Sequence, residues 1–323
     1  MKKIKLMLFV VVAVVLLFTA FAAYRCVDCR TANTEAVRLY LPEGTTYKAL
    51  CDTLLLNHVA RLDGDRGWFH LKARLLGLDK RVRTGSYVVQ PNMRELDLIR
   101  KLRNGQQDPV RLTIGRFRTP EQLNGYLNRK LMHNEFNVTL DSFYLIRPNT
   151  YEFYWTVTPE TFMERMEREW KAESEKWKVE SGKLSARDIV TLASIVEEET
   201  NNNGEKPLIA SVYLNRLRRG IPLQADPTVK YAVGDFTLRR ILNRHLATDS
   251  PFNTYLHTGL PPAPICLPSA ASVDAVLNAP ETNYLYFCAS DQMDGTHRFA
   301  ATLAEHNRNA AAFHAALNRK GIR

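Results

Sequence analysis

The sequence has few of the features that mark several common protein classes. It holds only five cysteines among 323 residues, too few for a disulfide-built scaffold, and the odd number leaves at least one thiol unpaired. Cys26 and Cys29 form a lone C-x-x-C pair, which we interpret as structural or incidental because a zinc site needs more ligands. The chain also lacks a Gly-rich phosphate-binding loop. We therefore expect no metal and no cofactor.

Acidic residues are in the minority, and the formal net charge is +10. The basic residues are scattered, and no stretch interleaves them with aromatic residues as single-stranded nucleic acid binders do. We therefore expect no nucleic acid partner. We interpret most of the surplus as solvated surface charge, with an acidic extracellular polymer or a membrane surface as the alternative partner.

The sequence has a single long apolar run, over residues 6–23, and three lysines precede it. Its length is that of a membrane span, and the positive charges predict that the N-terminal end stays in the cytoplasm. We predict a cytoplasmic stub at residues 1–5 and a single transmembrane anchor at residues 6–24, with the rest of the chain outside the membrane. A cleaved signal peptide ending near Ala22 is one alternative, and a lipid anchor on Cys26 is another.

The region after the anchor reads as short strands and helices. Alternating apolar residues predict a strand over residues 37–41, followed by a helix capped by Thr46. Residues 85–89 form a second predicted strand, and a helix then runs from Asn92 to a stop at Gly105. These elements predict a small α+β module, which either binds glycan or acts as a spacer.

Two further patterns lie downstream. The order strand, turn, helix recurs from Val110 through Thr119 to Leu123. Residues 159–178 have the spacing of an amphipathic helix, with Phe162 and its i+4 and i+8 neighbours on the packed face.

A carboxylate-rich helix follows, and Ser185 and Asp188 predict its capping box. Helical phase places Glu197 at the edge of the apolar stripe and Glu198 on the outward face with Thr191 and Ser194. Glu199 is in phase with buried positions as well. Apolar surroundings raise the pKa of a carboxyl group, as a proton donor to a glycosidic oxygen requires. Spacing alone does not choose between Glu197 and Glu199.

Several motifs in fixed order resemble the YceG-like endolytic murein transglycosylases. They are Pro148–Tyr151, Leu192–Thr200, Val212–Leu217, Leu223–Val229, Asn253–Tyr255, Gly259–Pro262, Tyr284–Phe287 and the closing His297, Phe299, Thr302, His306 and Asn307. Departures occur at Leu267–Ser269 and at Thr296, where the family usually has other residues. They put substrate contacts from these loops in doubt.

The resemblance implies an α+β fold with a LysM-like module at residues 35–106 and a mixed α/β catalytic domain of the YceG-like type at residues 107–323. It also implies a lyase at the bacterial inner membrane, with its catalytic domain on the periplasmic side. This enzyme would cleave the β-1,4 bond between N-acetylmuramic acid and N-acetylglucosamine in nascent strands, form 1,6-anhydro ends and so terminate glycan elongation. Peptidoglycan strands and peptidoglycan synthases are the implied partners.

The family's catalytic glutamate falls on Glu197, which would serve first as acid and then as base. A single carboxylate suffices because the nucleophile is the sugar's own 6-hydroxyl, whereas ordinary glycosidases need a second carboxylate. The candidate substrate-binding residues are Asn215, Gln224, Asp226, Thr228, Asn253 and Tyr255. Two alternatives stay open: a hydrolase of lysozyme or glucosaminidase type with Asp226 as second carboxylate, and a glycan-binding scaffold without catalysis.

Overall fold

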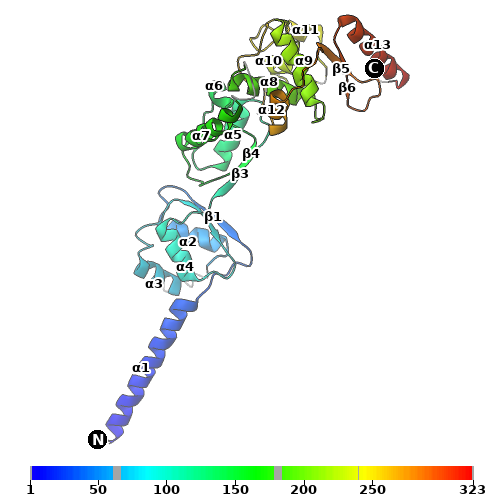
Figure 1. Cartoon of the computed structure of the whole chain (residues 1–323). Helices are drawn as coiled ribbons and strands as arrows, with labels where there is room; N and C mark the ends of the chain where they lie inside the picture. The colour runs from blue at the N-terminus through cyan, green and yellow to red at the C-terminus, as the bar shows by residue number, and fades with distance from the viewer. Residues whose placement is uncertain (1, 61–66, 178–183, 239, 322–323) are drawn as a thin grey trace. The chain divides into compact units, whose positions relative to one another are not determined.

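The structure is a computed structural model that describes residues 2–60, 67–177, 184–238 and 240–321 (Figure 1). Within the first helix, the side chains of residues 2–6, 8, 22, 23 and 25–28 are outside the description. The chain forms two compact units. Unit 1 comprises residues 1–112, 130–133 and 152–157, and unit 2 comprises residues 113–129, 134–151 and 158–323.

Unit 1 begins with the helix α1 (Lys2–Asp28). Apolar side chains along it are exposed, Phe9 and Leu17 among them. No helix among the residues that the structure describes is long and apolar enough to cross a membrane. The anchor at residues 6–24 stays a prediction.

The rest of unit 1 packs short helices on a two-stranded sheet. The strands β1 (Val37–Leu41) and β2 (Gly85–Val89) are antiparallel, with Leu39 opposite Tyr87. The helices are α2 (Tyr47–Leu56), α3 (Trp68–Leu76) and α4 (Glu95–Asn104). Leucine side chains from β1, α2 and α4 fill the core between sheet and helices.

The predicted helix ends in unit 1 are confirmed except for one. The Thr46 side chain accepts a hydrogen bond from Ala49 N at the start of α2, and Gly105 ends α4 in the left-handed conformation. The predicted start of α4 at Asn92 is wrong, because Asn92 has a φ of 60° and lies in a turn. Arg94 is the N-cap residue instead. The assignment of residues 35–106 to a LysM-like module stays a prediction, because compactness does not identify a module family.

The repeated order of strand, turn and helix is confirmed by β3 (Val110–Ile114) and α5 (Pro120–Lys130). β3 pairs with β4 (Asn149–Phe153) in a second two-stranded sheet, and the short helix α6 (Leu140–Phe143) lies between them in sequence. The amphipathic helix is α7 (Pro159–Trp177), and its Phe162 and Met166 are buried as predicted.

Unit 2 is built around α8 (Ala186–Glu199), against which α9 (Lys206–Arg218) and α12 (Ala270–Leu277) pack. Its other elements are α10 (Asp226–Val233), α11 (Asn243–Leu246), β5 (Tyr286–Ala289), β6 (His297–Ala300) and α13 (Leu303–Arg319). β5 and β6 are antiparallel. The mixed α+β class that the sequence predicts is thereby confirmed.

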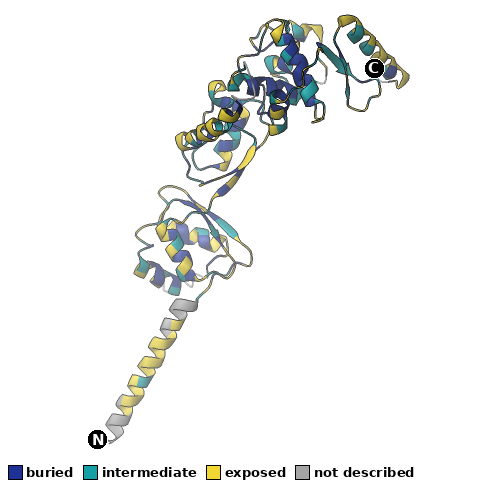
Figure 2. Ribbon diagram, in the orientation of Figure 1, coloured by how far each residue is buried: buried dark blue, intermediate teal, exposed yellow. Residues whose placement is uncertain are grey.

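The helix α8 is buried on all sides over residues 189–196, as the dark blue ribbon shows (Figure 2). The capping box of Ser185 and Asp188 is present as predicted. The prediction that Thr191 and Ser194 face outward is wrong, since both are buried. Ser194 Oγ accepts a hydrogen bond from Ile265 N at 3.0 Å, because the loop before α12 covers this face.

Candidate active site

Glu197 lies in the last turn of α8, where α9 and the start of α12 supply hydrogen-bond donors to its carboxylate. Lys206 Nζ at the start of α9 donates to Oε2 at 3.0 Å, and Ser269 Oγ donates to the same atom at 2.6 Å. Ser272 Oγ on α12 also donates to Oε2. Arg116 Nη1 lies 3.7 Å from Oε1. The Glu197 carboxylate is therefore held as an anion among cations and hydroxyl groups.

The pKa of Glu197 differs from the sequence expectation. Burial acts to raise this pKa, but the hydrogen bonds from Ser269, Ser272 and Lys206 outweigh it and lower the pKa below its ordinary value. The prediction of a raised pKa at Glu197 is wrong, because the donors come from elements outside α8. Its place as the family's catalytic glutamate stays a prediction.

Glu198 does not turn outward as predicted. Its carboxylate accepts hydrogen bonds from Arg118 Nε and Nη2, at 3.3 and 3.0 Å, and lies 3.5 Å from Arg116 Nε. The side chain is only 14% exposed. The segment between β3 and α5 carries both arginines and covers this side of α8.

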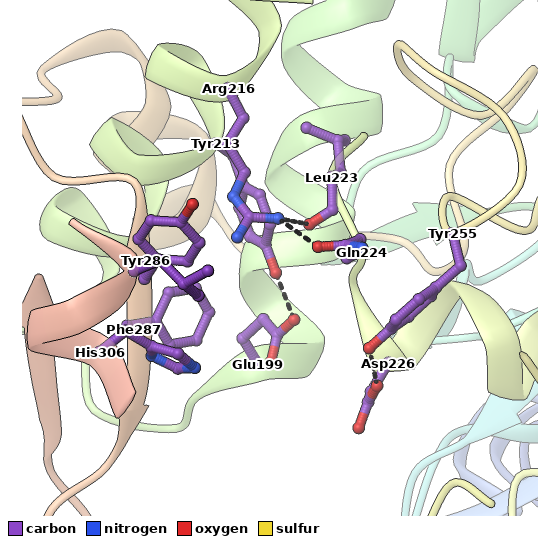
Figure 3. A pocket seen from close by; sticks show the side chains of 11 residues that line it. Glu199, Tyr213, Arg216, Leu223, Gln224, Asp226, Tyr255, Tyr286, Phe287 and His306 are labelled. Carbon is purple, nitrogen blue, oxygen red and sulfur yellow. Dashed lines mark hydrogen bonds between the residues drawn. The ribbon is translucent and has the colours of Figure 1, made fainter. Parts of the chain in front are cut away.

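Glu199, the last residue of α8, is in a different environment (Figure 3). It is half-buried, and its carboxyl group accepts a hydrogen bond from the Tyr213 hydroxyl on α9. The pKa of Glu199 is raised to about 7. Burial is the main cause and the Asp226 and Glu198 carboxylates add to it, while the Tyr213 hydrogen bond and the Lys230 charge act to lower this pKa. Glu199 thus has the raised pKa that the sequence argument sought in this helix.

Glu199 lines a pocket of about 350 Å³ in unit 2. Tyr213 and Arg216 of α9 form one side, and Tyr286 and Phe287 of β5 form another (Figure 3). Polar and aromatic groups that converge on a concave site are typical of a ligand-binding pocket.

Three of the predicted substrate-binding residues lie in this pocket: Gln224, Asp226 and Tyr255. The Tyr255 hydroxyl donates to Asp226 Oδ1 at 2.7 Å. Gln224 has a φ of 52°, and its Oε1 accepts a hydrogen bond from Arg216 Nη1 at 3.2 Å. The strained backbone at Gln224 fits a residue that is held in place for function.

The other three predicted residues donate hydrogen bonds to backbone carbonyl groups, and their role as substrate contacts stays a prediction. Asn215 Nδ2 donates to the carbonyl groups of Thr282 and Tyr284, both at 2.9 Å. Thr228 and Asn253 are fully buried. Thr228 Oγ1 donates to Ala225 O at 2.7 Å, and Asn253 Nδ2 donates to Leu246 O and Thr248 O, both at 2.9 Å. All three lie outside the residues that line the pocket.

Sequence reasoning did not select Arg216 as a site residue. Its Nε donates to Leu285 O at 2.7 Å, its Nη1 donates to Leu223 O at 3.0 Å, and its guanidinium lies 5.1 Å from the Tyr286 ring centroid. Arg216 thus joins α9, β5 and the loop that carries Gln224. Its position one turn after Tyr213 on the same helix was the signal available in the sequence.

The two histidines of the closing motif have different surroundings. His306 lines the pocket and stacks on Tyr286, and its pKa is lowered by burial and by Arg216. Its Nδ1 is buried without a hydrogen-bond partner among the described residues. His297 Nδ1 lies 3.0 Å from Glu205 Oε2 and does not line the pocket. Among the described side chains, no group of three or more His, Cys, Asp and Glu residues is arranged to hold a metal ion.

Comparisons with known proteins agree with this architecture. Residues 39–312 match the YceG-like family. An endolytic murein transglycosylase of Bacillus subtilis (strain 168) is 40% identical over 148 residues, which are 46% of this chain and 40% of that protein. An endolytic murein transglycosylase of Streptococcus pneumoniae (serotype 2, strain D39) is 34% identical over 137 residues, which are 41% of this chain and 25% of that protein.

A solved structure is similar over a larger share of the chain. The crystal structure of a yceG-like protein from Listeria monocytogenes superposes with a TM-score of 0.53 and 27% sequence identity. It covers 85% of this chain and 99% of that one. The two curated relatives are matched over less than half of their own length.

Proposed function

The chain belongs to the YceG-like family, and on that premise we propose that it is an endolytic lytic transglycosylase that cleaves peptidoglycan strands. The proposed bond is the β-1,4 bond between N-acetylmuramic acid and N-acetylglucosamine. The proposed product is a 1,6-anhydro-muramic end, and the proposed role is to terminate growing strands. The names of the two curated relatives support the reaction class.

One observation carries the proposal, namely the raised pKa of Glu199 in the pocket that it lines. A carboxyl group with a pKa of about 7 is protonated in a large fraction of molecules near neutral pH and still returns a proton readily. Glu197 has a lowered pKa and is ionised at the same pH. We therefore propose Glu199 as the acid. Glu197, the position that the motif comparison selected, is the alternative that the variants below test.

The proposed mechanism uses one carboxyl group twice. Glu199 donates its proton to the glycosidic oxygen while the bond from that oxygen to the anomeric carbon breaks. The Glu199 carboxylate then takes the proton of the muramic 6-hydroxyl while the 6-oxygen bonds to the anomeric carbon. No water is consumed. The Asp226 carboxylate in the same pocket would stabilise the positive charge of the oxocarbenium-like transition state.

The presence of Asp226 beside Glu199 also supports a second candidate function. A glycosidase that adds water needs an acid and a second carboxylate, and Asp226 would be that second group. Its hydrogen bond from Tyr255 fixes one of its oxygens. The two reactions leave different strand ends.

Digestion of purified sacculi followed by mass spectrometry tests the proposal. We expect anhydro-muramic ends, lighter by one water than the reducing ends that a hydrolase leaves. We expect Glu199→Gln to lower the rate by about 100-fold or more, since general acid catalysis contributes about that much. Glu197→Gln is the matched variant, and folded protein should retain most of the activity.

Three results would contradict these assignments. Reducing ends would favour the hydrolase. Loss of activity in Glu197→Gln but not in Glu199→Gln would return the acid to the motif position. Absence of digestion by the parent protein under all conditions would favour a glycan-binding scaffold.

We further propose a location at the bacterial inner membrane, with α1 as the anchor and unit 2 in the periplasm. The exposed apolar side chains of α1 support this placement. Protease protection in spheroplasts tests it, since only the N-terminal stub should survive inside. Association with peptidoglycan synthases remains a prediction from the family resemblance.

A further inference from the structure

Helix α3 of unit 1 carries an apolar stripe on its outer side. Leu71 and Leu75 lie one turn apart and are both exposed, Leu75 by 74%. Trp68 is half-buried and precedes Leu71 by three residues, on the same side of the helix. Phe69 and Ala73 of the same helix pack into the core of unit 1. Helix α3 therefore presents apolar side chains both to the core and outward, and we call Trp68, Leu71 and Leu75 the α3 stripe.

Buried polar contacts hold α3 next to the end of α1. Cys29 is the first residue after α1, and its carbonyl accepts a hydrogen bond at 2.9 Å from the backbone N–H of Glu95, the first residue of α4. The Glu95 carboxylate pairs with Lys72 Nζ of α3, and both side chains are buried. Helices α3 and α4 also both contact α1. The α3 stripe is thereby fixed beside the residue at which α1 ends.

The end of α2 adds exposed apolar residues near the same segment. Leu55 and Leu56 are exposed, Leu56 by 80%. Val59, three residues after Leu56, accepts with its carbonyl a hydrogen bond at 2.8 Å from Ala32 N, and Ala32 lies four residues after the end of α1. Exposed apolar groups that gather in this way mark an interaction surface.

Arginine side chains accompany the apolar residues. Arg30 and Arg94 are antiparallel backbone neighbours just after α1, and both side chains are exposed. Arg74 is exposed on α3. The exposed carboxylate of Asp97 on α4 already has a cation beside it, since Arg100 lies 3.5 Å away. A helix with tryptophan and leucine on one side and arginines beside them is typical of a helix that lies in the interface of a bilayer.

The predicted anchor places this surface at the depth of the lipid headgroups. Helix α1 continues for four residues beyond the predicted end of the anchor at residue 24. At about 1.5 Å per residue, it rises about 6 Å past the hydrocarbon core. The headgroup region on each side of a bilayer is about 5–7 Å thick. With the anchor in the bilayer, residues 29–32 and the elements bonded to them therefore lie at the outer edge of the headgroups.

We propose that unit 1 docks on the bilayer surface, with the α3 stripe among the lipid acyl chains and the neighbouring arginines on anionic headgroups. The partner is the lipid bilayer itself. The inference rests on the proposed location of α1 in the membrane. Docking gives unit 1 a fixed face toward the bilayer, which α1 alone does not provide because a single helix can rotate about its axis.

The experiment uses the full chain reconstituted in vesicles of phosphatidylcholine and phosphatidylglycerol. The sequence has four tryptophans, and the emission of Trp68 is the difference between the parent protein and Trp68→Phe. Phospholipids brominated near the headgroup end of the acyl chain quench an indole that touches them. Trp155→Phe gives the same difference for a tryptophan of unit 1 whose ring packs on Tyr40. Flotation of the vesicles on a density gradient reports separately whether α1 is inserted.

We expect brominated vesicles to quench Trp68 and to leave Trp155 unchanged. Leu75→Glu should lower the ratio of docked to undocked unit 1 about ten-fold or more, because the burial of a leucine is lost. Leu256→Glu is the matched control, since it changes a leucine of unit 2 that is 52% exposed, and it should leave the quenching of Trp68 as it is. Vesicles without phosphatidylglycerol should quench Trp68 less, with each arginine worth about five-fold in the same ratio.

Three results would overturn the proposal while the protein still floats with the vesicles. The first is quenching of Trp68 no stronger than that of Trp155. The second is equal quenching of Trp68 in Leu75→Glu and Leu256→Glu. The third is a Trp68 emission that moves to shorter wavelength as the protein-to-lipid ratio rises, without quenching, which would assign the stripe to a second copy of the chain.

Failure of the proposed location is visible separately. Loss of flotation contradicts the α1 anchor and overturns the docking with it. Failure of the proposed reaction appears as undigested sacculi and leaves the Trp68 emission as it is.

Discussion

Glu197 and Glu199 lie two residues apart on α8 and have opposite electrostatic surroundings. Lys206 and two serine hydroxyl groups donate to Glu197, whereas Glu199 has one hydroxyl donor and two carboxylates nearby. A donor favours the ionised form of a carboxyl group, and a neighbouring carboxylate disfavours it. The same side chain therefore has a lowered pKa at one position and a raised pKa at the other.

The pH dependence of sacculus digestion should report on Glu199. The acid must be protonated, so the rate should fall as the pH rises through about 7. Tyr213→Phe removes the hydroxyl that lowers this pKa, so the alkaline limb should move to higher pH by about one unit, on the scale of a hydrogen bond to a charged group. Rates measured between pH 5 and pH 9 test this.

Tyr231→Phe serves as the control, because that hydroxyl has no bond to Glu199. Its profile should match the parent profile. An alkaline limb that does not move in Tyr213→Phe would show that another group is the acid.

Stability should respond to the same group. The folded pKa of Glu199 lies above the ordinary value of 4.5, so the unfolded chain loses this proton more readily than the folded chain. Its contribution to stability is present below about pH 4.5 and is lost as the pH rises to about 7. At pH 8 the free energy of unfolding of Glu199→Gln should therefore exceed that of the parent protein by at most about 3 kcal/mol. At pH 4 the two proteins should be equally stable. A constant difference between the two pH values would contradict the raised pKa.

The site was predictable from the sequence only in part. Helical phase correctly predicted that the Glu199 side chain is partly buried, but it could not predict the pKa of Glu197. The groups that lower that pKa are Lys206, Ser269 and Ser272, which lie on other elements. Asn253 and Thr228 stay predicted substrate contacts. Their side chains donate to backbone carbonyl groups, as polar residues in tight turns often do.

At the scale of elements, Glu197 joins α8 to the first turn of α9 and to the start of α12. Lys206 is only 4% exposed, so Glu197→Gln would leave a buried cation without its counter-charge. We expect this variant to lower the free energy of unfolding by about 3 kcal/mol. Chemical denaturation at pH 7 measures the change.

Two further variants distinguish the stability lost with the Glu197–Lys206 ion pair from the stability lost when any carboxylate is neutralised. Adding Lys206→Met to Glu197→Gln should restore part of the stability, because the unpaired cation is gone. Glu169→Gln breaks a more exposed pair with Arg165 and should cost less than about 1 kcal/mol. Equal costs for Glu197→Gln and Glu169→Gln would mean that the contact does not hold the elements together.

Elements with strong local signals were predicted well. The Thr46 cap, the Gly105 stop and the capping box at Ser185 depend on residues within one turn of the helix end. The start of α4 was misplaced because Asn92 suits both a cap and a turn with positive φ. Glu198 was misplaced because Arg116 and Arg118, more than 75 residues earlier in sequence, cover it.

At the scale of the whole molecule, the surplus of basic residues matters for binding to an acidic polymer. The net charge of +10 is spread over scattered arginines and lysines, so the proposed attraction to the carboxylates of peptidoglycan would act through solvent. Such attraction is screened over about 10 Å at 0.1 M salt and about 3 Å at 1 M. Retention of the Glu199→Gln protein on sacculi should therefore fall as salt is raised between these concentrations.

Chitin, a neutral polymer of N-acetylglucosamine, separates charge from sugar contacts in this measurement. Stacking on aromatic rings and hydrogen bonds to sugar hydroxyl groups depend little on salt, so retention on chitin should stay nearly constant. Co-sedimentation with each polymer at rising sodium chloride concentration gives both curves. If retention on sacculi also stays constant, the basic surplus is only solvated surface, which is the first interpretation of the charge. If it falls, the charge adds a long-range attraction to whatever contacts the two units make with the strand.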